Sequence, residues 1–241
     1  MSGRVGSITT EIIADGLVFN MDAANRASTI PSTSTTKTFN TVTNKSGSLS
    51  TSGMYDDSIN SPSFASDADA SILTEEEFGW GAIEDFTINF FNYADYGTGP
   101  GANYNIYCTT TNSSWQWYQY QRKFTIYITG ANGGGANSNI GYPNHLSSIQ
   151  NYDTWYYTSL TRKSSTWVVY YNGVLDHSYG SDSNAAATPG KLYLMRDAAN
   201  SIGYNGNLAC ISIYNRALSA NEVLHNYNAL KERFGLWNTG Q

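Results

Sequence analysis

Trp155-Tyr-Tyr-Thr-Ser-Leu-Thr-Arg162, Val168-Val-Tyr-Tyr-Asn-Gly173 and Asn207-Leu-Ala-Cys-Ile-Ser-Ile-Tyr-Asn-Arg-Ala-Leu-Ser219 follow one another in the last third of the chain. All three are rich in the β-branched and aromatic residues that strands favour. The second ends in Asn-Gly, which is a strong signal for a two-residue type I′ hairpin turn. Together they predict the closing strands of an antiparallel β-protein.

Similar runs recur upstream, so that nine strands are expected in all. They cover residues 16–22, 86–93, 103–110, 114–121, 123–129, 154–161, 166–172, 191–195 and 208–214. In one of them Phe124, Ile126 and Ile128 alternate with polar positions, as they do when one face of a sheet meets the core. The pattern predicts an all-β chain folded as a two-sheet antiparallel sandwich.

One short C-terminal helix is expected at about 220–234. Ser219 and Glu222 have the spacing of a capping box, and Gly235 is a natural stop. Apolar residues recur three to four positions apart: Val223, Tyr227, Leu230 and Phe234. This stripe should lie against the sandwich, because a lone helix of this length is marginal in water.

Length and composition suit a single domain, expected at 16–241, after an N-terminal arm at 1–15 that we interpret as an anchoring segment. Residues 27–63 are rich in Ser, Thr, Asn and Gly and predict long loops with one or two edge strands. Cys108 and Cys210 are expected to be small buried residues without a disulfide.

Charge and hydropathy exclude several classes of partner. The net charge is -6 with no basic block, so nucleic acid is not expected. No run of about eighteen apolar residues occurs, and residues 1–7 lack an apolar segment. We therefore expect neither membrane insertion nor a signal peptide.

Several motifs, in their order, resemble the concanavalin A-like lectin/glucanase superfamily, and specifically its laminin-G-like jelly rolls, over residues 16–236. They are Gly16-Leu-Val-Phe, Asp85-Phe-Thr-Ile-Asn-Phe-Phe, the strand of Trp155, the Tyr-Asn-Gly hairpin and Ile213-Tyr-Asn-Arg-Ala-Leu-Ser219. The resemblance implies a jelly-roll sandwich in which Trp155 packs in the core. It also implies that Arg216 is tied to a neighbouring carboxylate or carbonyl.

The closing phrase Tyr227-Asn-Ala-Leu-Lys-Glu-Arg-Phe-Gly235 is similar to the ends of sandwich proteins of bacteriophages. This resemblance implies a virion component, either a capsid decoration or a tail or fibre protein, located on the particle surface. Its expected partners are other virion proteins and further copies of itself.

We expect no catalytic residues, and we interpret the chain as a protein that is not an enzyme. Superfamily glucanases carry a Glu-x-Asp-x-Glu strand that is absent here, and no carboxylate lies between Asp95 and Asp153. The clusters 75–77 and 84–85 are expected to be solvated loop charges. The three histidines are scattered, without a nucleophile motif beside them.

Calcium is the one cofactor for which the sequence offers candidates, because many related sandwiches hold it with Asp, Asn and backbone oxygens. Asp67 and Asp69 form the best local pair, with Asp22 or Asp197 as distant partners. The alternative is that these residues only form turns with their own backbone.

The candidate carbohydrate-binding surface is the run 114–122. Alternation places Trp115, Trp117, Gln119 and Gln121 on one face and Gln116, Tyr118, Tyr120 and Arg122 on the other. Flat rings beside amide and guanidinium donors suit sugars, and if the Trp face is inward the second set forms the surface. The alternatives are an aromatic core and an interface with a neighbouring subunit.

These observations favour a non-enzymatic structural protein of a phage virion that displays a surface for host polysaccharide. The alternative is a free-standing lectin-like module that binds glycans. A polysaccharide depolymerase is less favoured, since no carboxylate pair is found in the sequence.

Overall fold

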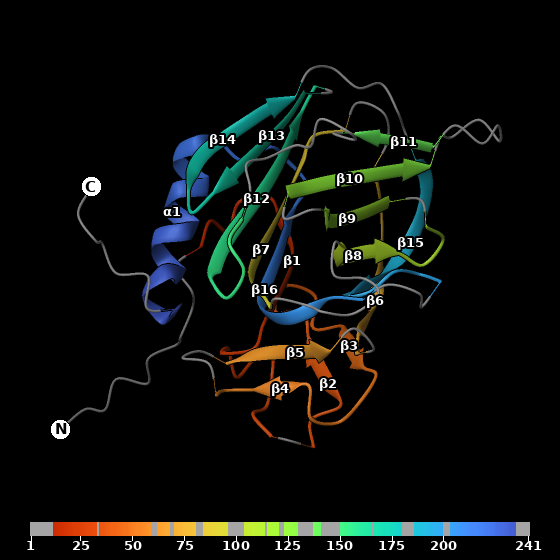
Figure 1. Cartoon of the computed structure of the whole chain (residues 1–241), viewed down its shortest axis with the longest axis vertical. Coiled ribbons are helices and arrows are strands. Elements are labelled where there is room, and N and C mark those ends of the chain that lie inside the picture. Colours follow the sequence, from red (N-terminus) through yellow and green to blue (C-terminus); the bar gives the residue numbers. More distant parts are fainter. Residues whose placement is uncertain are drawn as a thin grey trace.

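The computed structural model describes residues 12–32, 34–58, 62–67, 70–80, 84–95, 104–113, 115–120, 123–129, 137–140, 150–164, 166–179, 186–199 and 203–234. Two eight-stranded sheets face each other, and every pair of neighbouring strands in the described residues is antiparallel (Figure 1). One short helix lies near the C-terminus. The predicted two-sheet sandwich is confirmed.

The first sheet has the order β14-β13-β12-β7-β16-β5-β4, with β1 also paired to β16. Its strands are β1 (Leu17–Asp22), β4 (Tyr55–Asp56), β5 (Ser63–Asp67), β7 (Phe86–Ala94), β12 (Trp155–Lys163), β13 (Thr166–Tyr171), β14 (Val174–Tyr179) and β16 (Asn205–Tyr214). Asn172 and Gly173 both have positive φ between β13 and β14, as the hairpin prediction requires.

The second sheet has the order β11-β10-β9-β8-β15-β6-β3-β2. Its strands are β2 (Lys37–Phe39), β3 (Ser46–Leu49), β6 (Ile72–Trp80), β8 (Tyr104–Thr110), β9 (Trp115–Tyr120), β10 (Lys123–Thr129), β11 (Asn137–Ile140) and β15 (Ala186–Leu194). The expectation of one or two strands in 27–63 is wrong, because β2, β3 and β4 all lie there. These strands are short and hydroxyl-rich, so they lack the apolar alternation by which strands are predicted.

The acidic run 75–77 lies in strand β6, so its assignment to a loop is wrong. Glu75 and Glu77 are exposed, whereas Glu76 is buried between them. Oε1 of Glu76 accepts hydrogen bonds from Asn40 and Thr43, and these contacts compensate in part for the burial of the carboxylate. A polar residue at an inward position thus conceals the alternation of this strand.

Large aromatic side chains fill the space between the sheets. Trp115 and Trp117 have no exposed surface and stack on each other at 5.7 Å. The guanidinium of buried Arg162 lies 5.0 Å from the ring centre of Trp167, a cation–π contact. Of the two faces predicted for 114–122, the tryptophan face therefore points into the core.

A buried polar network joins the two sheets through Gln150. Its Oε1 accepts hydrogen bonds from Tyr107 at 3.1 Å and from Gln119 at 2.7 Å, both in the second sheet. Its amide nitrogen donates to Thr158 of the first sheet at 2.9 Å. Such a network, when satisfied, fixes one arrangement of the sheets.

The helix α1 (Ala220–Leu230) and the 3-10 turn η1 (Lys231–Phe234) cover the outer face of the first sheet (Figure 1). Phe234 stacks on Phe91 at 3.7 Å and lies 4.7 Å from Trp155. Trp155 is therefore buried under η1. Arg233 of η1 donates to both carboxylate oxygens of Asp22, at 2.8 and 2.6 Å.

Both cysteines are buried and free, as expected. No helix in the described part of the chain is long and apolar enough to cross a membrane. Of the arm predicted at 1–15, residues 1–11 lie outside the described residues. The following Ile12 and Ile13 pack against the cluster under α1, where the Ile13 amide donates to Asn226 at 2.8 Å.

Arg216 contacts both a carboxylate and a carbonyl at the start of the helix, as the family resemblance implies. It donates to Glu222 at 3.1 and 2.7 Å and to the carbonyl of Asp15 at 3.1 Å. Glu222 and Ser219 form the predicted capping box. The hydrogen bond from Arg216, with those from Ser219, outweighs partial burial and lowers the pKa of Glu222 from 4.5 to about 2.

This pKa predicts a stability change in acid. Because the folded pKa of Glu222 lies below its ordinary value, its contribution is present above about pH 4.5 and is lost as pH falls toward 2. We expect Glu222→Gln to be less stable than the native chain at pH 6, with the difference shrinking by pH 2.5. Urea unfolding at both pH values measures it, and a difference that does not shrink would contradict the assignment.

Candidate functional site

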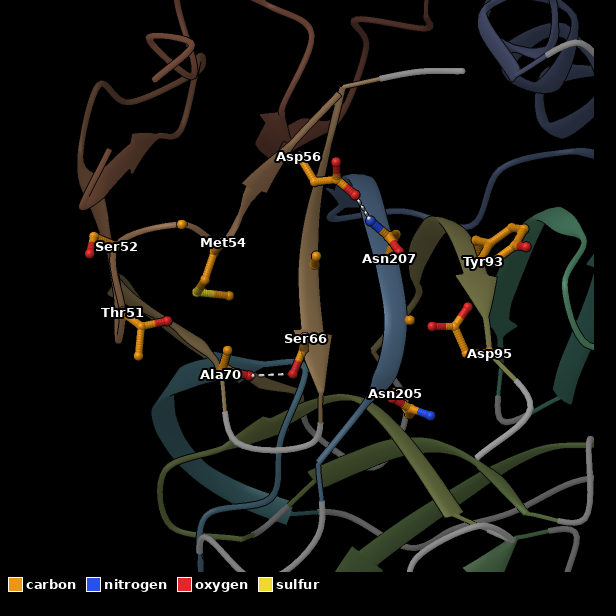
Figure 2. Close-up of a pocket in the computed structure, with 13 residues that line it drawn as sticks. Thr51, Ser52, Met54, Asp56, Ser66, Ala70, Tyr93, Asp95, Asn205 and Asn207 are labelled. Carbon is orange, nitrogen blue, oxygen red and sulfur yellow. Dashed lines mark hydrogen bonds between the residues drawn. The ribbon is translucent and has the colours of Figure 1, made fainter. Parts of the chain in front are cut away.

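A hollow of about 550 Å³ opens at the end of the first sheet (Figure 2). We call it the groove. It is formed by the loop 51–54, strands β4 and β5, the start of β16 and the end of β7. Its main polar side chains come from Ser52, Asp56, Tyr93, Asp95, Asn205 and Asn207. Its volume is in the range of small-ligand sites.

Strand register brings the polar residues of the groove together. Asn207 of β16 pairs with Ala65 of β5 on one side and with Tyr93 of β7 on the other. Two residues along, where side chains return to the same face, the amide of Asp95 donates to the carbonyl of Asn205 at 3.0 Å. Residues far apart in sequence thus form adjacent rows across three strands.

Gly206 allows β16 to approach β7 closely at the groove. Its φ is +132°, and a Cβ placed there would lie only 2.1 Å from the carbonyl oxygen of Tyr93. No side chain fits at that distance, and such a φ is readily adopted only by glycine. This position therefore requires glycine for both conformation and space.

Asp56 is held in the groove wall by protein hydrogen bonds. Its Oδ2 accepts from Asn207 at 3.1 Å (Figure 2). Its Oδ1 accepts from the Ser58 amide at 2.8 Å. Partial burial acts to raise the pKa of Asp56, but the hydrogen bonds from Ser58 and Asn207 outweigh it and lower the pKa. Asp56 is therefore a charged acceptor with a fixed orientation.

Asp95 has the opposite environment. Burial, followed by the charge of Asp153, raises the pKa of Asp95 above its ordinary value. The two carboxylates approach because β7 and β12 pair with Tyr93 opposite Trp155, and the Asp153 amide then donates to the Ala94 carbonyl at 2.9 Å. Asp95 and Asp153, which bound the long stretch of sequence without carboxylates, are therefore neighbours in the fold.

Tyr93 supplies an aromatic wall. Its ring is half-buried and lies 5.5 Å from the ring of Trp155, which restricts its movement. Burial, with smaller contributions from Asp153 and Asp95, raises the pKa of the Tyr93 hydroxyl. The groove thus combines an aromatic face, two carboxylates and two amides, a set that can accept and donate hydrogen bonds to a polyhydroxylated ligand.

The sequence-predicted surface lies on the other sheet, away from the groove. Trp115 and Trp117 are fully buried in the core, so the expectation that they contact carbohydrate is wrong. Gln116 is half-buried and Tyr118 is only 6% exposed, so that its replacement should also affect folding. The side chain of Tyr120 and all of Arg122 lie outside the described residues, and a sugar site at these positions stays a prediction.

The calcium residues are brought together only in part. Asp67 pairs with Asn205 at the edge of the groove, whereas Asp69 lies outside the described residues. Asp22 is paired with Arg233, and Asp197 is buried. Within the described residues no three His, Cys, Asp or Glu side chains lie close enough to hold a metal ion.

Sequence reasoning missed the groove, although one signal for it was present. Tyr93 and Asp95 lie two residues apart at the end of a strand. Asn205 and Asn207 also lie two residues apart, with Gly206 between them. Residues two positions apart in a strand point to the same face, so each pair presents both of its polar side chains on one side of the sheet. That the two pairs meet, however, depends on strand order, which the sequence does not show.

A family model described as the concanavalin A-like lectin/glucanases superfamily matches residues 65–224. The chain belongs to this superfamily. The match begins within β5 and covers β6 to β16 and the start of α1, so it includes most strands of both sheets and the groove residues of β5, β7 and β16, but not those of 51–56. No curated protein matches the chain.

Several solved structures are similar in fold to the chain over most of its length. Trypanosoma rangeli sialidase matches with a TM-score of 0.57 and 13% identity, covering 90% of this chain and 33% of the sialidase. The binding domain of botulinum neurotoxin DC in complex with SialylT matches with a TM-score of 0.60 and 11% identity, covering 90% and 52%. The binding domain of Paraclostridial mosquitocidal protein 1 gives 0.58 and 17%, covering 89% and 52%.

This chain spans only a third to about half of these structures. At such identities the likeness concerns the fold alone, because sandwiches of this kind carry different sites. Enzymes and binding domains both occur among them, so the site of this chain must indicate its function.

Proposed function

We propose that this chain is a non-enzymatic glycan-binding protein that holds a sugar in the groove. The observation that carries this proposal is that Asp56, Tyr93, Asp95, Asn205 and Asn207 converge on one open hollow. Two of the similar structures are binding domains, and one of them is in complex with SialylT. Both support a binding role for the fold.

The chemistry of the groove suits a sugar. Hydroxyl groups donate hydrogen bonds to the carboxylates of Asp56 and Asp95 and exchange them with the amide of Asn205, while the Asn207 amide nitrogen, which donates to Asp56 and Ser63, orients the Asp56 carboxylate. The C–H face of a pyranose packs against the ring of Tyr93. Because the wall residues are fixed by strand register and by Trp155, little ordering is required on binding.

A depolymerase is the second candidate, favoured by one observation. The groove contains two carboxylates whose pKa values are shifted in opposite directions, lowered for Asp56 and raised for Asp95. However, both oxygens of Asp56 already accept hydrogen bonds from the protein, which favours a positioning role over that of a nucleophile. Release of new reducing ends from a bound polysaccharide by pure protein would establish the enzyme.

We further propose that the chain is part of a bacteriophage particle, as a capsid decoration or a tail or fibre component that displays the groove to host polysaccharide. The similarity of residues 227–235 to phage sandwich proteins supports this location. Other virion proteins and further copies of the chain are its proposed partners. Mass spectrometry of purified particles tests the location, and absence of the chain from them would contradict it.

A glycan array locates the binding surface. We expect specific signals from the native chain, at least fivefold weaker signals from Asn205→Ala in the groove, and unchanged signals from Gln116→Ala on the second sheet. The opposite result would move the site to the surface of Gln116, Tyr118, Tyr120 and Arg122.

The same array, repeated with a chelator, tests the proposed calcium ion. A signal that disappears with chelator and returns with calcium would support a calcium site at Asp67 and Asp69. A signal that the chelator leaves unchanged would show that the groove binds glycan without metal.

A further inference from the structure

We propose that the groove selects glycans that carry no acidic group, namely those built from neutral sugars and amino sugars. It excludes sialylated and uronic-acid glycans. This inference rests on the proposed function, since it specifies which glycans the groove would hold. It starts from the charged side chains at the walls. Asp56 and Asp95 both line the groove, and no lysine or arginine lines it in the described part of the chain.

The sequence extends this observation beyond the described residues. No lysine or arginine occurs between Lys45 and Arg122, a stretch that supplies every wall of the groove except 205–207. The same stretch contains ten carboxylates: Asp56, Asp57, Asp67, Asp69, Glu75, Glu76, Glu77, Glu84, Asp85 and Asp95. No segment between β3 and β9 can therefore bring a cationic side chain to a bound anion.

The cations that flank the remaining wall in sequence are engaged elsewhere. The guanidinium of Arg196 lies over the ring of Tyr193 at 4.4 Å. That of Arg216 is paired with Glu222 at 2.7 Å, at the start of α1. Neither lines the groove, so residues 205–207 contribute only amides and backbone.

Carboxylates lie near both ends of the groove, and Arg26 is the cation that opposes them at the Tyr55 end. Beyond the effect of burial, Asp153 and Asp95 both raise the pKa of Tyr93. At the other end burial raises the pKa of Tyr55, beside Asp56; Asp57 raises it further and Arg26 opposes this. A carboxylate brought between these ends meets like charge in a partly desolvated site, where such repulsion is strongest.

Neutral and amino sugars meet the opposite condition. A hydroxyl or an ammonium group donates to a carboxylate, and a charged acceptor strengthens that hydrogen bond. Sialic acids and uronic acids carry a carboxylate that needs hydrogen-bond donors, and the carboxylates of the groove cannot donate when ionised. The amide nitrogen of Asn207 already donates to Asp56 and Ser63, so a sugar carboxylate there meets like charge without a cationic donor in the described lining. Selection thus acts through repulsion of the wrong ligand as well as attraction of the right one.

Isothermal titration of the native chain with matched oligosaccharides tests this inference. The probes are lactose, its sialylated form sialyllactose, and a glucosamine oligomer with free amino groups, each titrated with calcium and with chelator. At low salt we expect sialyllactose to bind at least about tenfold more weakly than lactose, and the glucosamine oligomer to bind at least as well as lactose. In about 1 M salt, where the Debye length is about 3 Å, the difference should shrink.

Matched charge removals show whether the groove itself discriminates. Asp56→Asn should narrow the ratio of lactose to sialyllactose affinity, whereas Glu77→Gln, at an exposed position of β6 in the other sheet, should leave it unchanged. Equal or tighter binding of sialyllactose, with or without calcium, would overturn the inference and leave the glycan-binding function standing. If no array glycan and none of these probes binds folded protein, the proposed function and the inference fall together.

Discussion

Replacement of Gly206 by alanine is expected to lower the free energy of unfolding by about 3–5 kcal/mol and to abolish glycan binding. The new Cβ would lie 2.1 Å from the Tyr93 carbonyl oxygen and 3.0 Å from Cα of Ala94, both backbone atoms that cannot turn away. β16 and β7 must therefore separate at the groove. Urea unfolding and glycan titration measure the two effects.

Gly53 provides the matched control for this substitution. It also lines the groove and has a positive φ of +94°, but nothing lies within 4 Å of a Cβ placed there. Gly53→Ala should therefore cost only the backbone strain, about 1–2 kcal/mol. If the two variants lose equal stability, the close approach of β16 to β7 is not what requires glycine at position 206.

Replacement of Asp22 by alanine is expected to cost about 3–5 kcal/mol, because it leaves the largely buried Arg233 without its partner. The guanidinium of Arg233 meets both oxygens of Asp22, whose side chain is only 2% exposed. This pair joins β1 to η1 and so holds the helical segment on the first sheet. The midpoint of urea unfolding measures the loss.

Two further variants separate this buried pair from an ordinary ion pair. Asp15→Ala removes a partner of Arg216 that is 86% exposed, and it should cost less than about 1 kcal/mol. The double variant Asp22→Leu with Arg233→Met should recover part of the stability lost in Asp22→Ala, because no charge is then left unpaired. A double variant less stable than Asp22→Ala would contradict this interpretation.

Local patterns in the sequence were enough to predict the sandwich and its helix. The strands of Trp155 and Val168, the Asn172-Gly173 turn and the capping box at Ser219 are all governed by contacts between near neighbours. The strands that were missed have no such pattern. In β6 the buried Glu76 breaks the apolar alternation, and Asn40 and Thr43, distant in sequence, donate hydrogen bonds to it.

The candidate site depends on strand order, which a single sequence does not reveal. Asp95 and Asp153 become neighbours only because β12 pairs with β7, and Asn207 meets Asp56 only because β5 pairs with β16. The sequence instead suggested a sugar site in the run that contains Trp115 and Trp117, whose rings suit a hydrophobic core as well as a sugar site. Aromatic residues alone did not distinguish the two uses.

Asp95 offers the most direct test, because its environment disfavours its own charge. Burial and the charge of Asp153 raise the pKa of Asp95 in the folded chain. Ionised Asp95 therefore lowers the free energy of unfolding. Asp95→Asn keeps the shape and removes the charge. At pH 7 its melting temperature should therefore equal or exceed that of the native chain.

The decisive measurement is thermal unfolding and glycan titration of Asp95→Asn on the same sample, using a neutral oligosaccharide that the native chain binds. If the groove is the binding site, the variant retains or gains stability and binds at least about tenfold more weakly, since it loses a charged acceptor. Unchanged affinity in a folded Asp95→Asn variant would contradict the assignment of the groove as the glycan site.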